Sequence, residues 1–198
     1  MARKPKTAFR GTNGPPENRW RNDGWWTSTF AFAAPFVLYL RTMAPTIYNL
    51  DSAELTTAAA TGGLVRATGY PLYLVIGRLW SQLPMGDVGY RMNLLSAVCG
   101  ALTVMLAERI LRRLGVGVWA RLAAVGLLAV AQFFWALSLI AEVYTLHTAI
   151  LAGVILALVR WSEQPTPGRL GLATFLVGIG FGNHVATVLA APACVWFV

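Results

Sequence analysis

The chain has 198 residues, of which 57% are hydrophobic and only 12% are charged, and its mean hydropathy is +0.58. Because this composition cannot supply the polar shell of a soluble domain, it predicts a membrane protein with several spans. The formal net charge of +8 comes from clusters beside the apolar segments and not from one basic face, which favours membrane orientation over nucleic-acid binding.

The N-terminal segment precedes the first apolar run. Residues 1–24 are basic and contain proline and glycine, which predicts a disordered cytoplasmic tail. Trp25 and Trp26 are typical of an interfacial aromatic belt, and the apolar run from Thr27 to about Leu40 follows them. A signal peptide is the alternative, but the long preceding tail and the lack of a clean small-residue cleavage pattern favour a retained anchor.

Residues 49–90 are expected to form the first outer loop, with short helices of its own. Asp51 and Glu54 have the spacing of a capping box at a helix start. Gly62 and Gly63 are expected to end that helix, and Pro71 to begin the next one. The apolar stretch 71–83 would extend only about 20 Å as a helix, less than the roughly 30 Å of hydrocarbon, so it is predicted to lie in the interface.

The rest of the chain contains further apolar segments of spanning length, about 17 to 20 residues each. They are predicted at 92–107, 121–139, 142–159 and from 170 to the C-terminus. The expected fold is therefore an all-α polytopic membrane protein, with residues 25–198 as one module of five to six spans. The sequence stops inside an apolar segment, so further helices or a partner subunit are expected to complete the module.

Charge bias predicts the orientation of the spans. With a cytoplasmic N-terminus, twelve of the sixteen cations fall on the cytoplasmic side, whereas the outer segments balance four cations with four acids. A multi-pass membrane protein with an outward-facing loop is therefore expected. The remaining polar residues then cluster at the outer ends of the spans: Asp51, Glu54, Arg91, Asn93, Glu142, Tyr144, His147, Asn183 and His184.

This clustering predicts an outward-facing polar cavity, because a charged group in the membrane costs about 2.5–3.5 kcal/mol by insertion scales unless it has partners or water. Each residue alone also has a structural interpretation. Asp51 and Glu54 can cap a helix, and Tyr70 can anchor a turn at the interface. Arg91 can pair with Asp87, or it can bind phosphate through its bidentate guanidinium.

The same ambiguity holds for the imidazoles. His184 alone is typical of a hydrogen-bonded packing residue, and Glu142, Tyr144 and His147 can belong to an ordinary helix start. Metal binding by histidines and acids has no spacing such as HExxH to support it. Cys99 lies in an apolar run, as does the other cysteine of the chain, so no disulfide framework is expected.

Several sequence pieces together carry a resemblance to a known family. They are APTIYNLDSAEL, GLVRATGYPLYLVIGRL, GDVGYRMNLLSA, AEVYTLH and GIGFGNH, in that order. The chain resembles a bacterial membrane-protein family related to animal endoplasmic-reticulum protein O-mannosyltransferases, in the GT-C glycosyltransferase class. The resemblance implies the N-terminal helical module of an enzyme that transfers a sugar from a polyprenyl phosphate to a hydroxyl group of a protein, lipid or glycan outside the cytoplasm.

The resemblance also implies roles for residues of this chain. Asp51 matches the acidic residue of the first outer loop and is the expected base, and Glu54 is expected to position the acceptor. The residues expected to contact donor or acceptor are Arg66, Tyr70, Arg91, Asn93, Glu142, Tyr144, His147, Asn183 and His184. Relatives usually carry histidine at the position of Arg66, and arginine binds anions but cannot act as a neutral base.

The expected partners are membrane lipid, the lipid-linked sugar and the acceptor, with any divalent metal requirement left open. Two other functions stay open from the sequence. One is a transporter or lipid-binding subunit, in which the polar cluster is a substrate pathway. The other is a non-catalytic membrane scaffold, in which the acids only cap helices.

Overall fold

A computed structural model of the chain describes residues 24–49, 51–67 and 69–198, and the regular structure within them is entirely helical. The predicted all-α class is therefore confirmed for this part of the chain. The predicted tail, residues 1–24, lies outside the described residues except for Gly24. The helices are α1 (Gly24–Thr42), α2 (Asp51–Thr61), α3 (Pro71–Trp80), α4 (Val88–Arg113), α5 (Val118–Val130), α6 (Gln132–Leu137), α7 (Val143–Glu163), α8 (Pro167–Asn183) and α9 (Thr187–Phe197).

Among the residues that the structure describes, two helices are long and apolar enough to cross a membrane by themselves. They are α4, with 26 residues, and α7, with 21. Both coincide with predicted spans and support the predicted membrane protein. The predicted total of five to six spans is not confirmed, because α5 and α9 are apolar but have only 13 and 11 residues.

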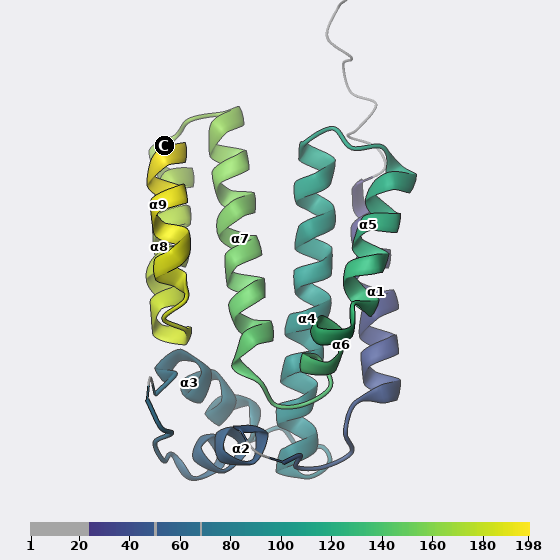
Figure 1. Ribbon diagram of the computed structural model, residues 1–198, viewed down its shortest axis with the longest axis vertical. Coiled ribbons are helices and arrows are strands. Elements are labelled where there is room, and N and C mark those ends of the chain that lie inside the picture. Colours follow the sequence, from purple (N-terminus) through teal and green to yellow (C-terminus); the bar gives the residue numbers. More distant parts are fainter. Residues whose placement is uncertain (1–23, 50, 68) are drawn as a thin grey trace, which may run out of the picture.

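Two predicted spans are interrupted. The segment 121–139 is divided into α5 and α6, because Ala131 between them adopts an extended conformation with φ −60° and ψ 127°. The prediction that the last apolar segment forms a single span is also wrong. α8 ends at Asn183, His184 is extended, and α9 folds back alongside α8 (Figure 1). The His184 Nδ1 atom accepts a hydrogen bond from the Ala186 N–H at 3.1 Å, which stabilises the turn.

The long helices run roughly along one axis, and α2 and α3 lie across one end of them (Figure 1). We call this the site end; it also contains the N-terminal turns of α4 and α7. The predicted boundaries of the two short helices are confirmed: α2 ends before Gly62, which has a φ of 74°, and Pro71 begins α3. Only glycine adopts such a positive φ without steric cost.

The short helices are fixed to the bundle by their apolar faces. Leu55 and Ala59 of α2 and Tyr73 of α3 are buried in one core cluster with Met92 of α4 and Leu146 of α7. Because α2 buries Leu55 and Ala59, the first-turn carboxylates of the same helix are held at a fixed place beside the bundle.

The segment between α1 and α2 is attached to α4 by a buried amide. The Asn93 Nδ2 atom donates to the carbonyl oxygens of Ala44, at 2.8 Å, and Thr46, at 2.9 Å, and Asn93 is completely buried. Four residues earlier on α4, Gly89 lies so close to Ile47 that a Cβ atom would overlap the Ile47 backbone nitrogen. The chain therefore approaches α4 here at a distance that only glycine allows.

Replacing Gly89 with alanine is expected to displace the Ile47 segment and to lower the free energy of unfolding by about 1–3 kcal/mol, as overpacked sites do. Thermal unfolding in detergent, followed by tryptophan fluorescence, would measure the change. Gly178→Ala in α8 is the matched control, since nothing lies within 4 Å of its added Cβ. The control is expected to stabilise the helix by up to about 1 kcal/mol. Equal effects of the two changes would contradict the close approach at Ile47.

Candidate functional site

A narrow pocket at the site end brings together polar residues from α2, the loop after it and the start of α7. Its volume is about 20 Å³. Six of the predicted site residues line it, together with three apolar neighbours. The lining residues are Asp51, Glu54, Leu55, Val65, Arg66, Tyr70, Glu142, Val143 and Tyr144. Residues that lie 91 or more positions apart in the sequence, such as Asp51 and Glu142, thus share one pocket.

Arg66 joins the two acids of α2. Its guanidinium forms ion pairs with Asp51 and with Glu54, the latter at 3.1 Å between Nε and Oε2, and its backbone N–H donates to Glu54 Oε1 at 2.8 Å. The Arg66 side chain is 66% exposed and that of Asp51 is 57% exposed. Ion pairs this exposed typically contribute only about 0–1 kcal/mol, so the arginine can leave the carboxylates at little energetic cost.

Glu142 is the third carboxylic acid of the pocket and the most buried of the three. It is 9% exposed, and its backbone N–H donates to the Ser96 Oγ atom of α4 at 3.1 Å. Burial, and secondly the charge of nearby Asp51, raises the pKa of the Glu142 side chain to about 7. Glu142 has an extended backbone and directly precedes α7. Because of its raised pKa, the pocket wall contains a carboxyl group that exchanges its proton near neutral pH.

The raised pKa of Glu142 predicts a pH-dependent stability. Protonation is easier in the folded chain, so Glu142 favours folding most below its ordinary pKa of 4.5, and this contribution is lost as the pH rises towards 7. Glu142→Gln is expected to flatten the stability profile between these values by roughly 1–2 kcal/mol, since the pocket opening screens part of the effect. Unfolding temperatures measured from pH 4 to 8 would test this. A profile identical to that of the unchanged chain would contradict it.

Four rings form a cluster next to the pocket. His184 lies at its centre, with ring centroids 5.8 Å from Tyr70, 5.4 Å from Tyr144 and 5.3 Å from His147. Because His184 Nδ1 accepts the Ala186 N–H, the neutral ring carries its proton on Nε2. Within the described residues, the buried Nδ1 atom of His147 has no hydrogen-bond partner. The predicted gathering of both histidines with the acids at one end is thus present in the structure.

Tyr70 connects the ring cluster to the carboxylates. It stacks on His184 with an interplanar angle of 15° and also lines the pocket. Its backbone is left-handed, with φ 42° and ψ 53°, immediately before Pro71. This conformation costs a non-glycine residue on the order of 1–3 kcal/mol. The surrounding packing therefore holds the Tyr70 ring in place against local strain.

Besides the two histidines, three predicted contact residues do not line the pocket. Arg91 donates to the carbonyl oxygens of Ser81, Met85 and Gly86 and so closes the turn before α4. Asn93 holds the segment that precedes α2, and Asn183 Nδ2 donates to the Val143 carbonyl oxygen at 3.2 Å. In this structure these three side chains form hydrogen bonds to the backbone of segments next to the site, and so they position the site without lining it.

Two further residues near Glu142 were not among the predicted site residues. Ser96 binds the Glu142 backbone. The hydroxyl group of Tyr73, a residue with no exposed surface, lies within electrostatic range of the Glu142 carboxyl group. Tyr73 lies in the first turn of α3, directly after the Tyr70-Pro71 turn. Among residues 24–49, 51–67 and 69–198, no group of three or more histidine, cysteine or acidic residues has an arrangement that could hold a metal ion.

Comparison with known proteins agrees with the sequence pieces around this site. Residues 51–198 match the family described as the Protein O-mannosyl-transferase TMEM260 N-terminal domain. The chain belongs to this family. All eleven predicted site residues lie within the matched range, and the resemblance to animal O-mannosyltransferases is confirmed.

Two longer relatives show what share of such a protein this chain covers. Protein O-mannosyl-transferase TMEM260 of Mus musculus is 29% identical over 190 residues, which cover 91% of this chain and 27% of that protein. Protein O-mannosyl-transferase tmem260 of Dictyostelium discoideum is 24% identical over 189 residues, covering 84% of this chain and 22% of that protein. The chain thus spans about a quarter of the length of these relatives. No solved structure matches it.

Proposed function

We propose that this chain is the N-terminal, acid-bearing part of a membrane glycosyltransferase that transfers a sugar from a polyprenyl phosphate to a hydroxyl acceptor. The observation that carries the proposal is the pocket in which Asp51, Glu54 and Glu142 meet Arg66, beside two imidazoles. The names of the relatives, protein O-mannosyl-transferases, support mannose as the sugar and a protein hydroxyl as the acceptor.

In the proposed reaction, the acceptor oxygen attacks the anomeric carbon and the bond between that carbon and the phosphate oxygen breaks. Asp51 accepts the proton of the acceptor hydroxyl as general base, and Glu54 orients the acceptor. The leaving phosphate gains negative charge, which the Arg66 guanidinium and the His184 Nε2–H are suited to stabilise. The two carboxylates and the cation are already neighbours, with Arg66 paired to both acids.

The proposal requires Arg66 to change partners. Pockets for small ligands typically have volumes of about 300–1,000 Å³, and the site pocket has about 20 Å³. Arg66 fills the space beside the acids, and its exposure allows it to turn towards a phosphate. A bound donor would thereby free Asp51 to accept a proton only when the leaving group is present.

The proposed location of the reaction is the outer face of the bacterial cytoplasmic membrane, with a cytoplasmic N-terminus. Arg109, Arg112 and Arg113 belong to the C-terminal turns of α4, whereas Asp51 and Glu54 lie at the opposite, site end. Cations typically mark the cytoplasmic side of membrane proteins. Reactivity of single cysteines with an impermeant maleimide, placed at either end, would test this orientation.

The test of function is transfer of radiolabelled mannose from polyprenyl-phosphate mannose to a serine- and threonine-containing peptide, using the purified protein in detergent. Labelled peptide that forms with this protein and not with a boiled sample supports the proposal. Movement of the lipid-linked sugar across sealed vesicles without any labelled product would instead support a transporter. If the full-length protein gives neither labelled product nor movement of the sugar, the scaffold interpretation is supported.

A further inference from the structure

The end of the bundle opposite the site contains a second cavity. We call it the basic end; it contains the C-terminal turns of α4 and α7 and the N-terminal turn of α1 (Figure 1). The cavity has a volume of about 680 Å³ and shares no lining residue with the site pocket. It is lined by Gly24, Trp25, Arg112, Arg113, Leu114, Gly115 and Glu163.

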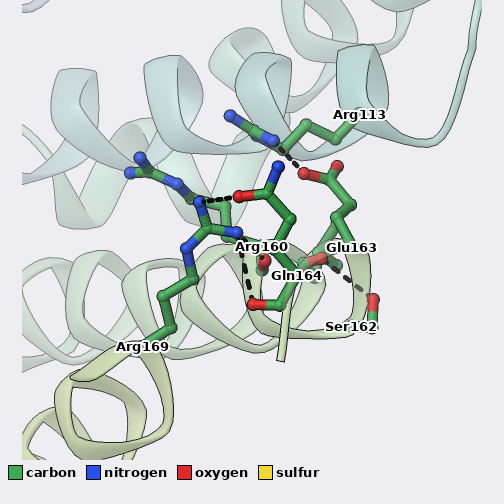
Figure 2. Close-up of polar contacts among 7 residues, drawn as sticks. Arg113, Arg160, Ser162, Glu163, Gln164 and Arg169 are labelled. Atoms are coloured by element: carbon green, nitrogen blue, oxygen red, sulfur yellow. Dashed lines mark hydrogen bonds and ion pairs between the residues drawn. The ribbon is translucent and has the colours of Figure 1, made fainter. Parts of the chain in front are cut away.

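Most cations at this end are bound by protein groups. Figure 2 shows Arg113 pointing towards Glu163, with which it forms an ion pair. Arg169 points into the turn between α7 and α8, where it donates to the Arg160 carbonyl oxygen at 2.7 Å and to Gln164 Oε1 at 2.7 Å. These contacts close the turn and leave those two guanidinium groups largely occupied.

Arg112 differs from these neighbours. Within the described residues its guanidinium has no hydrogen-bond or ion-pair partner. It lies within electrostatic range of Glu108 and of three other arginines, Arg109, Arg113 and Arg121. The guanidinium packs against the backbone of Gly24, where an added Cβ atom would overlap Nη1. The cavity wall thus holds two cations and one acid, and the Arg112 guanidinium has unused donors.

The chemistry of this wall suits a phosphate group. A guanidinium binds phosphate through two parallel hydrogen bonds, and a neighbouring cation strengthens the interaction. Trp25 and Trp119, at the same end, are 76% and 82% exposed. Exposed tryptophans are typical of the level where lipid headgroups meet water. The anion that a membrane presents at this level is a phospholipid headgroup.

We propose that Arg112, together with Arg113, binds the phosphate of an anionic phospholipid in the cavity of the basic end. Glu163 competes with that phosphate for Arg113, so it limits the affinity. The inference is independent of the proposed transferase activity, because the two cavities share no residue and lie at opposite ends of the bundle.

The test is native mass spectrometry of the purified protein in detergent, titrated with dioleoylphosphatidylglycerol. Arg112→Gln is expected to weaken binding about fivefold, the effect of one cation near a membrane surface. Glu163→Gln is expected to strengthen binding about twofold, because it frees Arg113. Arg160→Gln is the matched control: it removes one cation from the same end, but Arg160 does not line the cavity, so a change below about twofold is expected.

Two further titrations distinguish the sources of phosphate. Dioleoylphosphatidylcholine is expected to bind less tightly than the anionic lipid, and millimolar inorganic phosphate is expected to leave lipid binding unchanged. Equal losses in Arg112→Gln and Arg160→Gln would overturn the proposal, since the lipid would then respond only to total charge. Displacement of the lipid by inorganic phosphate would overturn it in favour of a free-phosphate site.

Discussion

Replacing Asp51 with asparagine is expected to lower sugar transfer by about two to four orders of magnitude, the usual contribution of a positioned general base. Asparagine keeps the size of the side chain and removes the proton acceptor. The fold should persist, because the Asp51 side chain is 57% exposed and its ion pair with Arg66 is a surface contact. The measurement is the initial rate of mannose transfer to peptide, alongside the unfolding temperature of both proteins.

Asp87→Asn is the matched control for this change. Asp87 also lies at the site end, where its carboxylate accepts the Tyr90 N–H as the N-cap of α4. Asparagine caps a helix about as well as aspartate, so transfer should be unchanged in this variant. An Asp51→Asn protein that transfers mannose at the original rate would remove Asp51 from the proposed chemistry. The scaffold interpretation predicts that only the unfolding temperature falls.

The gathering of the site residues could be predicted because charge bias and helix signals are local. Gly62 and Pro71 mark the ends of short helices wherever they occur. Counting arginines then places the start of α7 on the same side as α2. Glu142 and Asp51 were expected to be neighbours on these grounds, and both line the pocket.

Individual partners could not be predicted in this way, because they depend on tertiary packing. The pairing of Arg66 with both acids requires the loop after Gly63 to fold back over α2. The break at Ala131 involves neither glycine nor proline. The turn at His184 uses a side-chain hydrogen bond that hydropathy does not record. The length of an apolar segment therefore predicted two continuous spans where the structure has breaks.

A buried ion pair lies beside the basic turn between α4 and α5. Glu108 and Arg121 have side chains that are 0% and 1% exposed, and their Oε1 and Nε atoms lie 2.8 Å apart. The second Glu108 oxygen accepts a hydrogen bond from Ser28 Oγ at 2.7 Å, and Arg121 Nη1 donates to the Val116 carbonyl oxygen at 3.2 Å. The pair therefore joins α1, α4 and α5.

Replacing Arg121 with methionine is expected to lower the free energy of unfolding by about 3–5 kcal/mol, because it leaves Glu108 buried without its cation. Glu108→Leu should cost a similar amount by leaving Arg121 unpaired. Unfolding of the detergent-solubilised protein with sodium dodecyl sulfate, followed by tryptophan fluorescence, would measure both losses. Sugar transfer should fall only as far as the folded fraction falls, since the pair lies at the basic end, away from the site pocket.

The double variant Glu108→Leu with Arg121→Met separates a missing partner from damage to the packing. If each single loss comes from an uncompensated buried charge, removing both charges should recover most of the stability, because apolar groups of similar volume often replace a buried pair without loss. The coupling energy between the two changes should then be at least about 2 kcal/mol. Additive losses would mean that the two charges do not depend on each other, and would contradict their role as a coupled pair.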